Sequence, residues 1–298
     1  MYLVFDIGGT FVKHALIDSL GNIHTKNKYY TPDNINFLIE SMSNLYSEFS
    51  NVKGIAVSCP GIVDTKTATI YHGGALPYLH NKNIKRLLER RCDVPIPIEN
   101  DAKSAALAEL WLGSVKGHSN AVVLVLGSAV GGGLIINGKL YRGKNLSAGE
   151  VSYMMNGINF SSLKADFLGV TGSAVEMINK IANARGIESS GQQVFELING
   201  GDSEAKSIFE EYCLNLAIHI LNLQYLLDPE VIAIGGGISV QPIVEKTIKQ
   251  VIANIQINNP IHYARPNVVT CKFQSDANLL GALYNFFQCE QQNVLSPN

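Results

Sequence analysis

The chain has 298 residues, of which 46% are hydrophobic and 16% charged, an ordinary composition for a globular protein long enough to form two domains. Its formal net charge of −2 supplies no overall basic field, which argues against nucleic acid as the main partner and favours a small-molecule ligand. The five cysteines are scattered without metal-binding spacing, as expected of buried thiols in a reducing cytoplasm.

Two apolar stretches raise the question of a leader or a membrane segment. The first run, Met1–Phe5, has no basic prelude and meets Asp6 at once, so it does not resemble a signal peptide. The charge-free span from Gly117 to Gly138 is long enough for a membrane helix, but a glycine-rich turn interrupts it and its valines favour strands. We therefore expect a soluble, cytoplasmic protein with no membrane partner.

The N-terminal part is predicted to begin with a strand, a glycine turn and a return strand. Residues 3–5 lead through Asp6-Ile7-Gly8-Gly9-Thr10 into an apolar run over 12–17. A helix is expected next over 35–49, with Thr31-Pro32 as its N-cap and first turn. A short strand over 54–57 then runs into Ser58-Cys59-Pro60-Gly61, and such strand ends commonly hold ligands.

An irregular loop over 65–80 and a short strand over 94–98 precede an acidic step, Glu99-Asn100-Asp101, which opens an alanine-rich helix over 102–112. His72 and His80 lie in the loop with no partner at a recognisable spacing, and we assign them no role. Asn100 and Asp101 are good helix N-caps. A carboxylate beside an amide at a strand end can also bind a polyol and accept its proton, so the two interpretations coexist.

The central stretch, 122–141, repeats the design of the chain start. Two apolar runs flank a turn that contains Ser128, and we expect the glycines of this turn to adopt positive φ and expose amides to an anion; they are Gly127, Gly131, Gly132 and Gly133. An ordinary hairpin is the simple alternative for either turn alone. Two such turns, each with added oxygen ligands, indicate diverged halves and a nucleotide-phosphate site.

The rest of the chain is predicted to add helices, a strand and a third glycine turn. A polar loop over 143–149 leads to Glu150, and helices are expected over 174–184 and 203–227. A buried strand over 231–234 runs into Gly235-Gly236-Gly237 and a helix patterned over 243–255, an order that suits a nucleotide contact. An apolar helix over 275–287 and a structureless polar tail over 288–298 end the chain.

Together these motifs resemble the ROK family of sugar kinases and repressors, within the actin-like, ribonuclease-H-like ATPase superfamily. The resemblance covers almost the whole chain, with four motifs in the family's order. It implies an α/β fold of two ribonuclease-H-like domains with a cleft between them. The small domain would comprise 1–115 plus a C-terminal helix at about 277–298, and the large domain 116–276. It further implies ATP and magnesium as cofactors and a homodimer.

The resemblance also implies a role for individual residues. Asp101 would be the catalytic base that deprotonates a C6 hydroxyl, and Asp6 would serve magnesium through water. Sugar would contact Gly61, Asn100, Asp101 and Glu150. The nucleotide and its phosphates would contact Asp6, Gly8, Gly9, Thr10, Gly127, Ser128, Gly131, Gly132, Gly235, Gly236 and Gly237.

Two departures from the family pattern bear on metal and substrate. Ser128-Ala129 stands where the family usually has Thr-Gly, which keeps one hydroxyl. After Glu150 many members continue to Gly-His and a cysteine cluster that binds zinc, whereas this chain has Ser152-Tyr153. We therefore expect no structural zinc, and we expect nearby apolar side chains to pack in its place, namely Leu163, Phe167, Leu168 and Val170.

The altered segment favours a β-glucoside such as cellobiose, because the resemblance places it at the C1 and C2 side of the sugar and Tyr153 could stack on an aglycone. The β-glucoside kinases of the family are similar in lacking the cluster. A glucokinase or N-acetylhexosamine kinase is the alternative. A non-catalytic sugar-sensing regulator is more remote, because the chain enters its first strand by Leu3 without room for a DNA-reading helix. An acyl-group kinase or another actin-like ATPase is a further alternative.

Overall fold

The computed structural model describes the backbone of residues 1–295 and the side chains of residues 1–291, and it divides into two compact units. The first unit contains Met1–Trp111, Arg142–Ala148 and the described chain from Asp276 onward. The second contains Leu112–Tyr141 and Gly149–Ser275. Arg142–Ala148 lies inside the range expected for the second domain, yet it clusters with the first.

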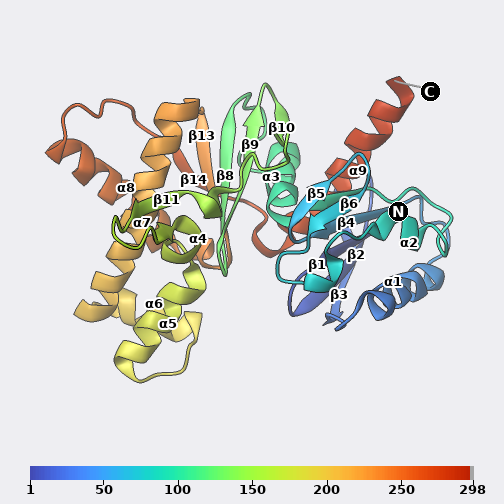
Figure 1. Cartoon of the computed structure of the whole chain (residues 1–298), viewed down its shortest axis with the longest axis horizontal. Helices are drawn as coiled ribbons and strands as arrows, with labels where there is room; N and C mark the ends of the chain where they lie inside the picture. Colours follow the sequence, from blue (N-terminus) through green and yellow to red (C-terminus); the bar gives the residue numbers. More distant parts are fainter. Residues whose placement is uncertain (296–298) are drawn as a thin grey trace. The chain divides into compact units, whose positions relative to one another are not determined.

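The first unit is built on a five-stranded sheet (Figure 1). Its strand order is β3 (Ile23–Tyr30), β2 (Phe11–Ile17), β1 (Tyr2–Ile7), β4 (Ile55–Cys59) and β7 (Ile98–Asn100). The first three strands form an antiparallel meander, whereas β1, β4 and β7 run parallel. The carboxyl ends of three parallel strands therefore meet at one edge of this sheet.

Helices and a small hairpin complete this unit. They are α1 (Ile35–Glu48), α2 (Ile84–Leu88), α3 (Asp101–Leu112), α9 (Ala277–Leu295), the 3₁₀ turns η1 (Pro77–Leu79) and η4 (Gln274–Asp276, which begins in the other unit), and strands β5 (Ile62–Asp64) and β6 (Thr69–His72). Helix α9 packs against β1, β4 and β7 and crosses α3 so closely that a Cβ on Gly281 would lie 1.6 Å from the carbonyl oxygen of Ser104. The last helix of the chain is thus part of the first unit.

The second unit repeats the same sheet. Its order is β10 (Lys139–Tyr141), β9 (Val130–Ile136), β8 (Ala121–Leu126), β13 (Val231–Gly236) and β14 (Val268–Thr270), again with three antiparallel strands followed by two parallel additions. Identical order and direction in both sheets agree with diverged copies. The α/β fold class is confirmed.

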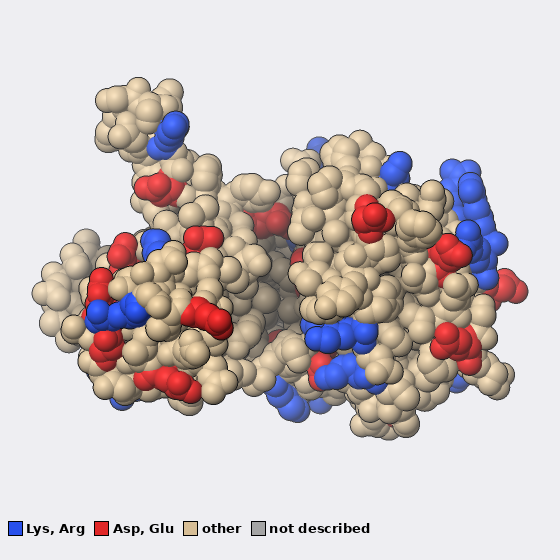
Figure 2. Space-filling model, turned by 90° about the horizontal axis from the view of Figure 1, so that it is seen from below, with Lys and Arg blue, Asp and Glu red and all other residues tan. Residues whose placement is uncertain are grey.

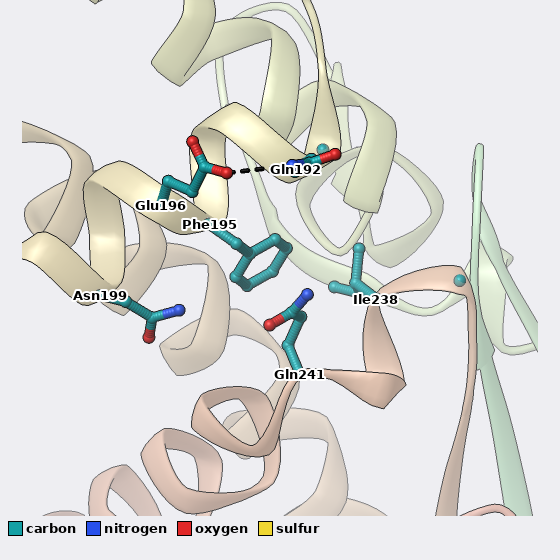
Figure 3. Close-up of a pocket in the computed structure, with 8 residues that line it drawn as sticks. Gln192, Phe195, Glu196, Asn199, Ile238 and Gln241 are labelled. Carbon is teal, nitrogen blue, oxygen red and sulfur yellow. Dashed lines mark hydrogen bonds between the residues drawn. The ribbon is translucent and has the colours of Figure 1, made fainter.

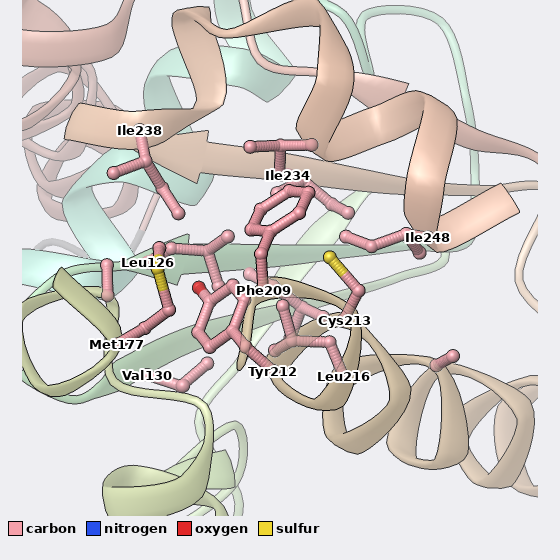
Figure 4. Close-up of a cluster of buried hydrophobic side chains, with 14 of the residues drawn as sticks. Leu126, Val130, Met177, Phe209, Tyr212, Cys213, Leu216, Ile234, Ile238 and Ile248 are labelled. Atoms are coloured by element: carbon pink, nitrogen blue, oxygen red, sulfur yellow. The ribbon is translucent and has the colours of Figure 1, made fainter. Parts of the chain in front are cut away.

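Helix α7 (Ser203–Leu227) forms the centre of the second unit's core. Figure 4 shows its Phe209, Tyr212 and Leu216 against residues of β8 and β13. The surrounding elements are η2 (Val151–Tyr153), β11 (Met155–Ile158), β12 (Ala165–Phe167), α4 (Leu168–Thr171), α5 (Ala174–Arg185), α6 (Gly191–Gly200), η3 (Gly237–Val240) and α8 (Pro242–Asn258). The buried apolar face of α7 anchors the strands whose ends carry glycine turns.

Several expected boundaries were wrong for physical reasons. Helix α1 begins at Ile35 with Asn34 as its N-cap, and the Thr31 hydroxyl instead donates to the Gly8 carbonyl at 2.6 Å. Strand β7 starts only at Ile98, because Pro95 and Pro97 lack N–H groups, although their carbonyls accept from β4 at 3.0 and 3.1 Å. Helix α6 was not foreseen, and α9 continues through most of the expected polar tail, to Leu295.

Within the part of the chain that the structure describes, no helix is long and apolar enough to cross a membrane. Basic and acidic side chains are intermixed on the face drawn in Figure 2.

Candidate functional site

In the first unit, the strand ends gather three carboxylates around one buried thiol. Asp6 pairs with Ser58 across β1 and β4, and Cys59 pairs with Asn100 across β4 and β7. Burial, together with the carboxylates of Asp101, Glu99 and Asp6, raises the pKa of the Cys59 thiol well above its ordinary value. The expected catalytic and magnesium carboxylates therefore lie at the same sheet edge.

Asp6 is a buried carboxylate whose orientation is fixed. Its Oδ1 accepts from the Ser58 hydroxyl and from Nδ2 of Asn278 on α9, both at 3.0 Å, while Lys13 Nζ lies 3.4 Å from Oδ2. Magnesium typically keeps several waters and uses only one or two protein carboxylates, so this single oriented group fits a water-mediated contact.

The turn between β1 and β2 presents Gly8, Gly9 and Thr10. A Cβ on Gly8 would lie 2.9 Å from the Phe11 carbonyl oxygen, so the tight turn requires glycine there. Gly9 and Thr10 are exposed at its tip, and Gly9 lies against Ala75 of the loop that follows β6. Backbone amides at such a turn can approach an anion closely.

Asn100 caps α3, one of the two functions that the sequence left open, and it also contacts Gly61 and Asp101. Its Oδ1 accepts from the Lys103 amide at 3.0 Å, which caps α3. Its Nδ2 donates to the Gly61 carbonyl and to Asp101 Oδ1, both at 2.9 Å. Gly61, Asn100 and Asp101 are thus joined by hydrogen bonds in one cluster, as expected of residues that share a substrate.

Asp101 is the first residue of α3, and its Oδ1 also accepts from the Ala102 amide at 2.8 Å. The carboxylate is therefore held by neighbouring donors at a helix N-terminus, where negative charge is favoured. Gly61 has φ +96°, and a Cβ there would lie 1.7 Å from the His72 carbonyl oxygen, so only glycine fits beside this loop. His72 approaches through its backbone.

Glu99 has a partner that no local pattern indicated. This residue is completely buried, and its carboxylate accepts from Arg142, which opens the segment Arg142–Ala148. Forty-three positions separate the two residues, so sequence spacing could not pair them. A glutamate inside an apolar strand was nevertheless a signal that a cation must lie nearby.

In the second unit, the turn between β8 and β9 contains only Gly127, Ser128 and Ala129. Ser128 is exposed, and the Gly127 carbonyl accepts from the Ala174 amide at the start of α5 at 3.0 Å. This turn is the counterpart of the Gly8–Thr10 turn in the first sheet.

The expected positive φ angles in this stretch were wrong. Gly131, Gly132 and Gly133 lie within β9, paired with Val125, Leu124 and Val123, and neither they nor Gly127 have positive φ. Gly132 instead allows a close approach of the protein's own chain, because a Cβ there would lie 2.4 Å from the Gly149 carbonyl oxygen. The strand pairing, which sequence spacing does not show, decides the difference.

The third glycine turn lies beside the second. Gly236 pairs with Leu126, the residue before Gly127, and has φ +95°. A Cβ on Gly236 would lie 2.0 Å from the Leu126 carbonyl oxygen, and one on Gly235 would lie 3.1 Å from Cys271 Sγ. Gly237 has open space in front of it and borders a cavity.

That cavity has a volume of about 330 Å³ and lies between α6 and the chain that follows β13 (Figure 3). Figure 3 shows Phe195 and Ile238 forming an apolar floor with amide side chains around it; the polar lining consists of Gln192, Glu196, Asn199 and Gln241. An apolar floor with several hydrogen-bonding groups suits a flat heterocycle. Helix α6, which supplies five of the eight lining residues, was not foreseen.

Glu150 lies in the second unit, half-buried immediately before η2. Tyr153, the last residue of η2, is 68% exposed. Of the side chains expected to pack in place of zinc, Leu168 is buried as expected, whereas the expectation was wrong for Leu163, Phe167 and Val170, which are exposed. The described residues include no group of three or more His, Cys, Asp or Glu side chains placed to hold a metal.

A polar chain holds the segment after Glu150 instead. Buried His219 of α7 hydrogen-bonds the side chain of Asn156 on β11, and Asn156 donates to Thr171 of α4. The Ser152 hydroxyl bridges to β9, accepting from the Val130 amide at 3.2 Å and donating to its carbonyl at 2.7 Å. These contacts fix the hairpin β11–β12 to the body of the unit.

Comparison with known proteins gives consistent matches along the chain. A family model described as the ROK family matches residues 2–288. The β-glucoside kinase of Listeria monocytogenes is 33% identical over 299 residues, covering 97% of this chain and 98% of that protein. The glucokinase of Halalkalibacterium halodurans is 30% identical over 267 residues, covering 80% of each. The crystal structure of a Streptococcus pneumoniae ROK family protein in complex with sucrose is 32% identical with a TM-score of 0.88, covering 97% of this chain and 99% of that one.

Proposed function

The chain belongs to the ROK family and is a sugar kinase, and we propose that it transfers the γ-phosphoryl group of ATP to the C6 hydroxyl of a β-glucoside such as cellobiose. The observation that carries this proposal is the hydrogen-bonded cluster of Gly61, Asn100 and Asp101 at the carboxyl ends of β4 and β7. Such a cluster combines a proton acceptor with groups that orient a polyol.

In this mechanism, Asp101 accepts the proton of the attacking hydroxyl. The two donors to its Oδ1, Asn100 and Ala102, hold the carboxylate in one orientation before the sugar binds. Asn100 and Glu150 hold neighbouring hydroxyls, and Gly61 forms part of the sugar pocket. Because phosphoryl transfer asks little covalent chemistry of the protein, positioning and charge neutralisation supply most of the rate.

For the nucleotide, we propose that the turns at Gly8–Thr10 and Gly127–Ala129 contact phosphates. The cavity between α6 and Gly237 would take the nucleoside, since its amide side chains can bond a base and Gly237 leaves room for close approach. Gly131 and Gly132 support the second turn from within β9. When bound, magnesium would neutralise phosphate charge, and Asp6 would hold it through water.

Three observations bear on the β-glucoside assignment. A relative that spans nearly the same length is a β-glucoside kinase. A similar structure holds sucrose, a disaccharide whose glucosyl unit is an α-glucoside, which supports room for a second sugar unit and not the β linkage. In this chain, exposed Tyr153 and Met155 follow Glu150, which gives an aglycone an aromatic surface to stack on. A second candidate is a glucokinase, which the relative from Halalkalibacterium halodurans favours.

The test compares kcat/KM for cellobiose, salicin, glucose and N-acetylglucosamine, with the phosphorylated carbon identified by NMR. We expect the β-glucosides to be preferred and C6 to be phosphorylated. A tenfold preference for glucose, about 1.4 kcal/mol of transition-state stabilisation, would overturn the β-glucoside assignment and leave the kinase assignment intact.

The role of Asp101 is tested separately by Asp101→Asn. We expect kcat to fall about 10² to 10⁴-fold with little change in KM for ATP, since only proton acceptance is removed. Asp93→Asn is a matched control, because Asp93 is an exposed carboxylate of the same unit. Near-normal turnover by a folded Asp101→Asn protein would remove Asp101 from the mechanism.

A further inference from the structure

Next to the proposed general base in the sequence, buried Glu99 forms an ion pair with Arg142, whose side chain is 24% exposed. Glu99 has 0% exposed surface and comes immediately before Asn100 and Asp101. Its Oε2 accepts from Nε of Arg142 at 2.9 Å and from Nη2 at 2.5 Å. A carboxylate in the interior requires a partner charge, and Arg142 supplies it.

The pair is linked to Asp101 by an unbroken series of hydrogen bonds. The other oxygen of Glu99, Oε1, accepts from the backbone amide of Asn100 at 2.8 Å. The Asn100 side chain in turn donates to Asp101 Oδ1 at 2.9 Å. The guanidinium of Arg142 therefore holds the Glu99 carboxylate in place. Glu99 in turn holds Asn100, which orients Asp101.

Arg142 also supports β7 from its other side. Its Nη2 donates to Asn285 Oδ1 of α9 at 3.2 Å, and Asn285 Nδ2 donates to the Ile98 carbonyl at 3.4 Å. The short strand β7 is thus held at Ile98 and at Asn100 by groups that share one guanidinium. A planar fork with several donors can make these contacts together, whereas an ammonium cannot.

Arg142 is the first residue of a short segment, Arg142–Ala148, that belongs to the first unit, while the residues before and after it belong to the second. The Ala148 amide donates to the Arg142 carbonyl at 3.2 Å, and Gly143 allows the bend with φ +71°. Tyr141 before it and Gly149 after it belong to the second unit, and Glu150 follows at once. The Arg142 side chain therefore anchors, in the unit of Asp101, the stretch of chain that leads to Glu150.

We propose that Arg142 is a positioning residue for phosphoryl transfer, which acts through Glu99 and Asn100 to hold the Asp101 carboxylate in the orientation that accepts the sugar proton. This inference rests on the proposed function. It differs from a purely structural role, in which the ion pair would stabilise the fold and leave the geometry of Asp101 unchanged.

The variant that separates the two roles is the double replacement Glu99→Gln with Arg142→Gln. Arg142→Gln alone leaves the buried Glu99 charge without its partner and can fail to fold. The double variant carries no charge at either position. The amide oxygen that replaces the Glu99 carboxylate can still accept from the Asn100 amide. We expect the double variant to melt close to wild type and to lose at least tenfold in kcat, with KM for ATP within twofold. We also expect the pH profile of its kcat to differ from that of wild type, because the variant changes the groups that hold Asn100 and Asp101.

Two further variants sharpen the result. Arg142→Lys keeps the charge and loses the planar fork, so its kcat should lie between wild type and the double variant. Arg185→Gln is the matched control, because Arg185 makes the same one-oxygen contact with Asp202, at 2.9 and 2.5 Å, on the surface of the second unit. We expect wild-type kinetics from it.

A folded double variant with kcat within twofold of wild type and an unchanged pH profile would overturn the positioning role. Failure of the wild-type protein to phosphorylate any sugar would instead refute the proposed function on which the role rests. The two failures are distinguishable because the first is seen only when the wild type is active.

Discussion

Replacing Gly61 by alanine tests whether the loop after β6 is part of the sugar site. Gly61 has φ +96°, and a Cβ would lie 1.7 Å from the His72 carbonyl oxygen and 3.0 Å from the Gly74 amide. Even a separation of 3.0 Å between the Cβ and the His72 carbonyl oxygen would be tighter than ordinary packing. To reach it, the two atoms must move apart by about 1.3 Å (3.0 − 1.7).

Gly61, which this contact would displace relative to His72, belongs to the proposed substrate cluster. The Gly61 carbonyl accepts from Asn100, which also holds Asp101, so the movement is transmitted to the general base. A misplacement of about 1 Å can cost 10²-fold in rate. We therefore expect Gly61→Ala to lower kcat/KM for the sugar by about 10²-fold, roughly 2.7 kcal/mol of transition-state stabilisation.

The left-handed conformation of alanine itself costs about 1–2 kcal/mol, and this part must be separated from the steric part. Gly117→Ala is the control, because Gly117 has φ +86° and a Cβ there would meet nothing within 4 Å. Steady-state kinetics with varied sugar at saturating ATP, alongside thermal melts, compare the two. A folded Gly61→Ala protein that keeps kcat/KM within threefold of wild type would refute the expectation, as would an equal loss in Gly117→Ala.

Three other predictions have defined outcomes. Gly281→Ala should lower the melting temperature, because its Cβ would lie 1.6 Å from the Ser104 carbonyl oxygen, whereas Gly200→Ala, with nothing within 4 Å, should raise it by removing a helical glycine; equal shifts would contradict the close crossing of α3 and α9. Tyr153→Ala should lower kcat/KM for salicin about tenfold relative to glucose through loss of stacking, and an unchanged ratio would exclude that contact. Elemental analysis of the purified protein should find no stoichiometric zinc, and one zinc per chain would disprove this.

Local patterns predicted which residues stand at the strand ends. Asp6 directly follows a short apolar run, and Asn100 and Gly236 stand one residue beyond such a run, so each position can be read from consecutive residues. Whether Gly131–Gly133 lie in a turn or in a strand depended on their pairing with β8, which the spacing of residues cannot show. Glycine suits both a turn and a strand that another chain segment approaches closely.

Contacts between distant positions account for the other differences. Glu99 and Arg142 are 43 positions apart, and Asp6 and Asn278 are 272 apart, so neither pair leaves a mark on local sequence. Exposure is similarly non-local: Leu163, between β11 and β12, and Val170 of α4 are apolar, yet they are 73% and 64% exposed. Polar contacts of Asn156 with Thr171 and His219 are made in this region instead. Threonine and asparagine are both favoured N-cap residues. Asn34 caps α1, because the hydroxyl of the expected cap, Thr31, donates instead to the distant Gly8 carbonyl.

The duplicated sheet suggests how the two copies came to differ in chemistry. The fourth strand in each order has a glycine of positive φ near its carboxyl end: Gly61, two residues after β4, has φ +96°, and Gly236, the last residue of β13, has φ +95°. At both positions a Cβ would strike a backbone carbonyl. The fifth strands differ, since β7 ends at Asn100 before Asp101, whereas β14 ends at Thr270 before Cys271, which packs on Gly235.

In the proposed mechanism the first copy carries the proton acceptor, Asp101, whereas the residue that follows the fifth strand of the second copy is Cys271. If the second copy binds the nucleotide, Gly236→Ala should impair the use of ATP, as Gly61→Ala is expected to impair the use of the sugar. Because its Cβ would lie 2.0 Å from the Leu126 carbonyl oxygen, next to the Gly127 turn, we expect KM for ATP to rise about tenfold or more while KM for the sugar changes less than twofold. A Gly236→Ala protein that is folded and impaired in sugar KM alone would show that this division of labour between the copies is wrong.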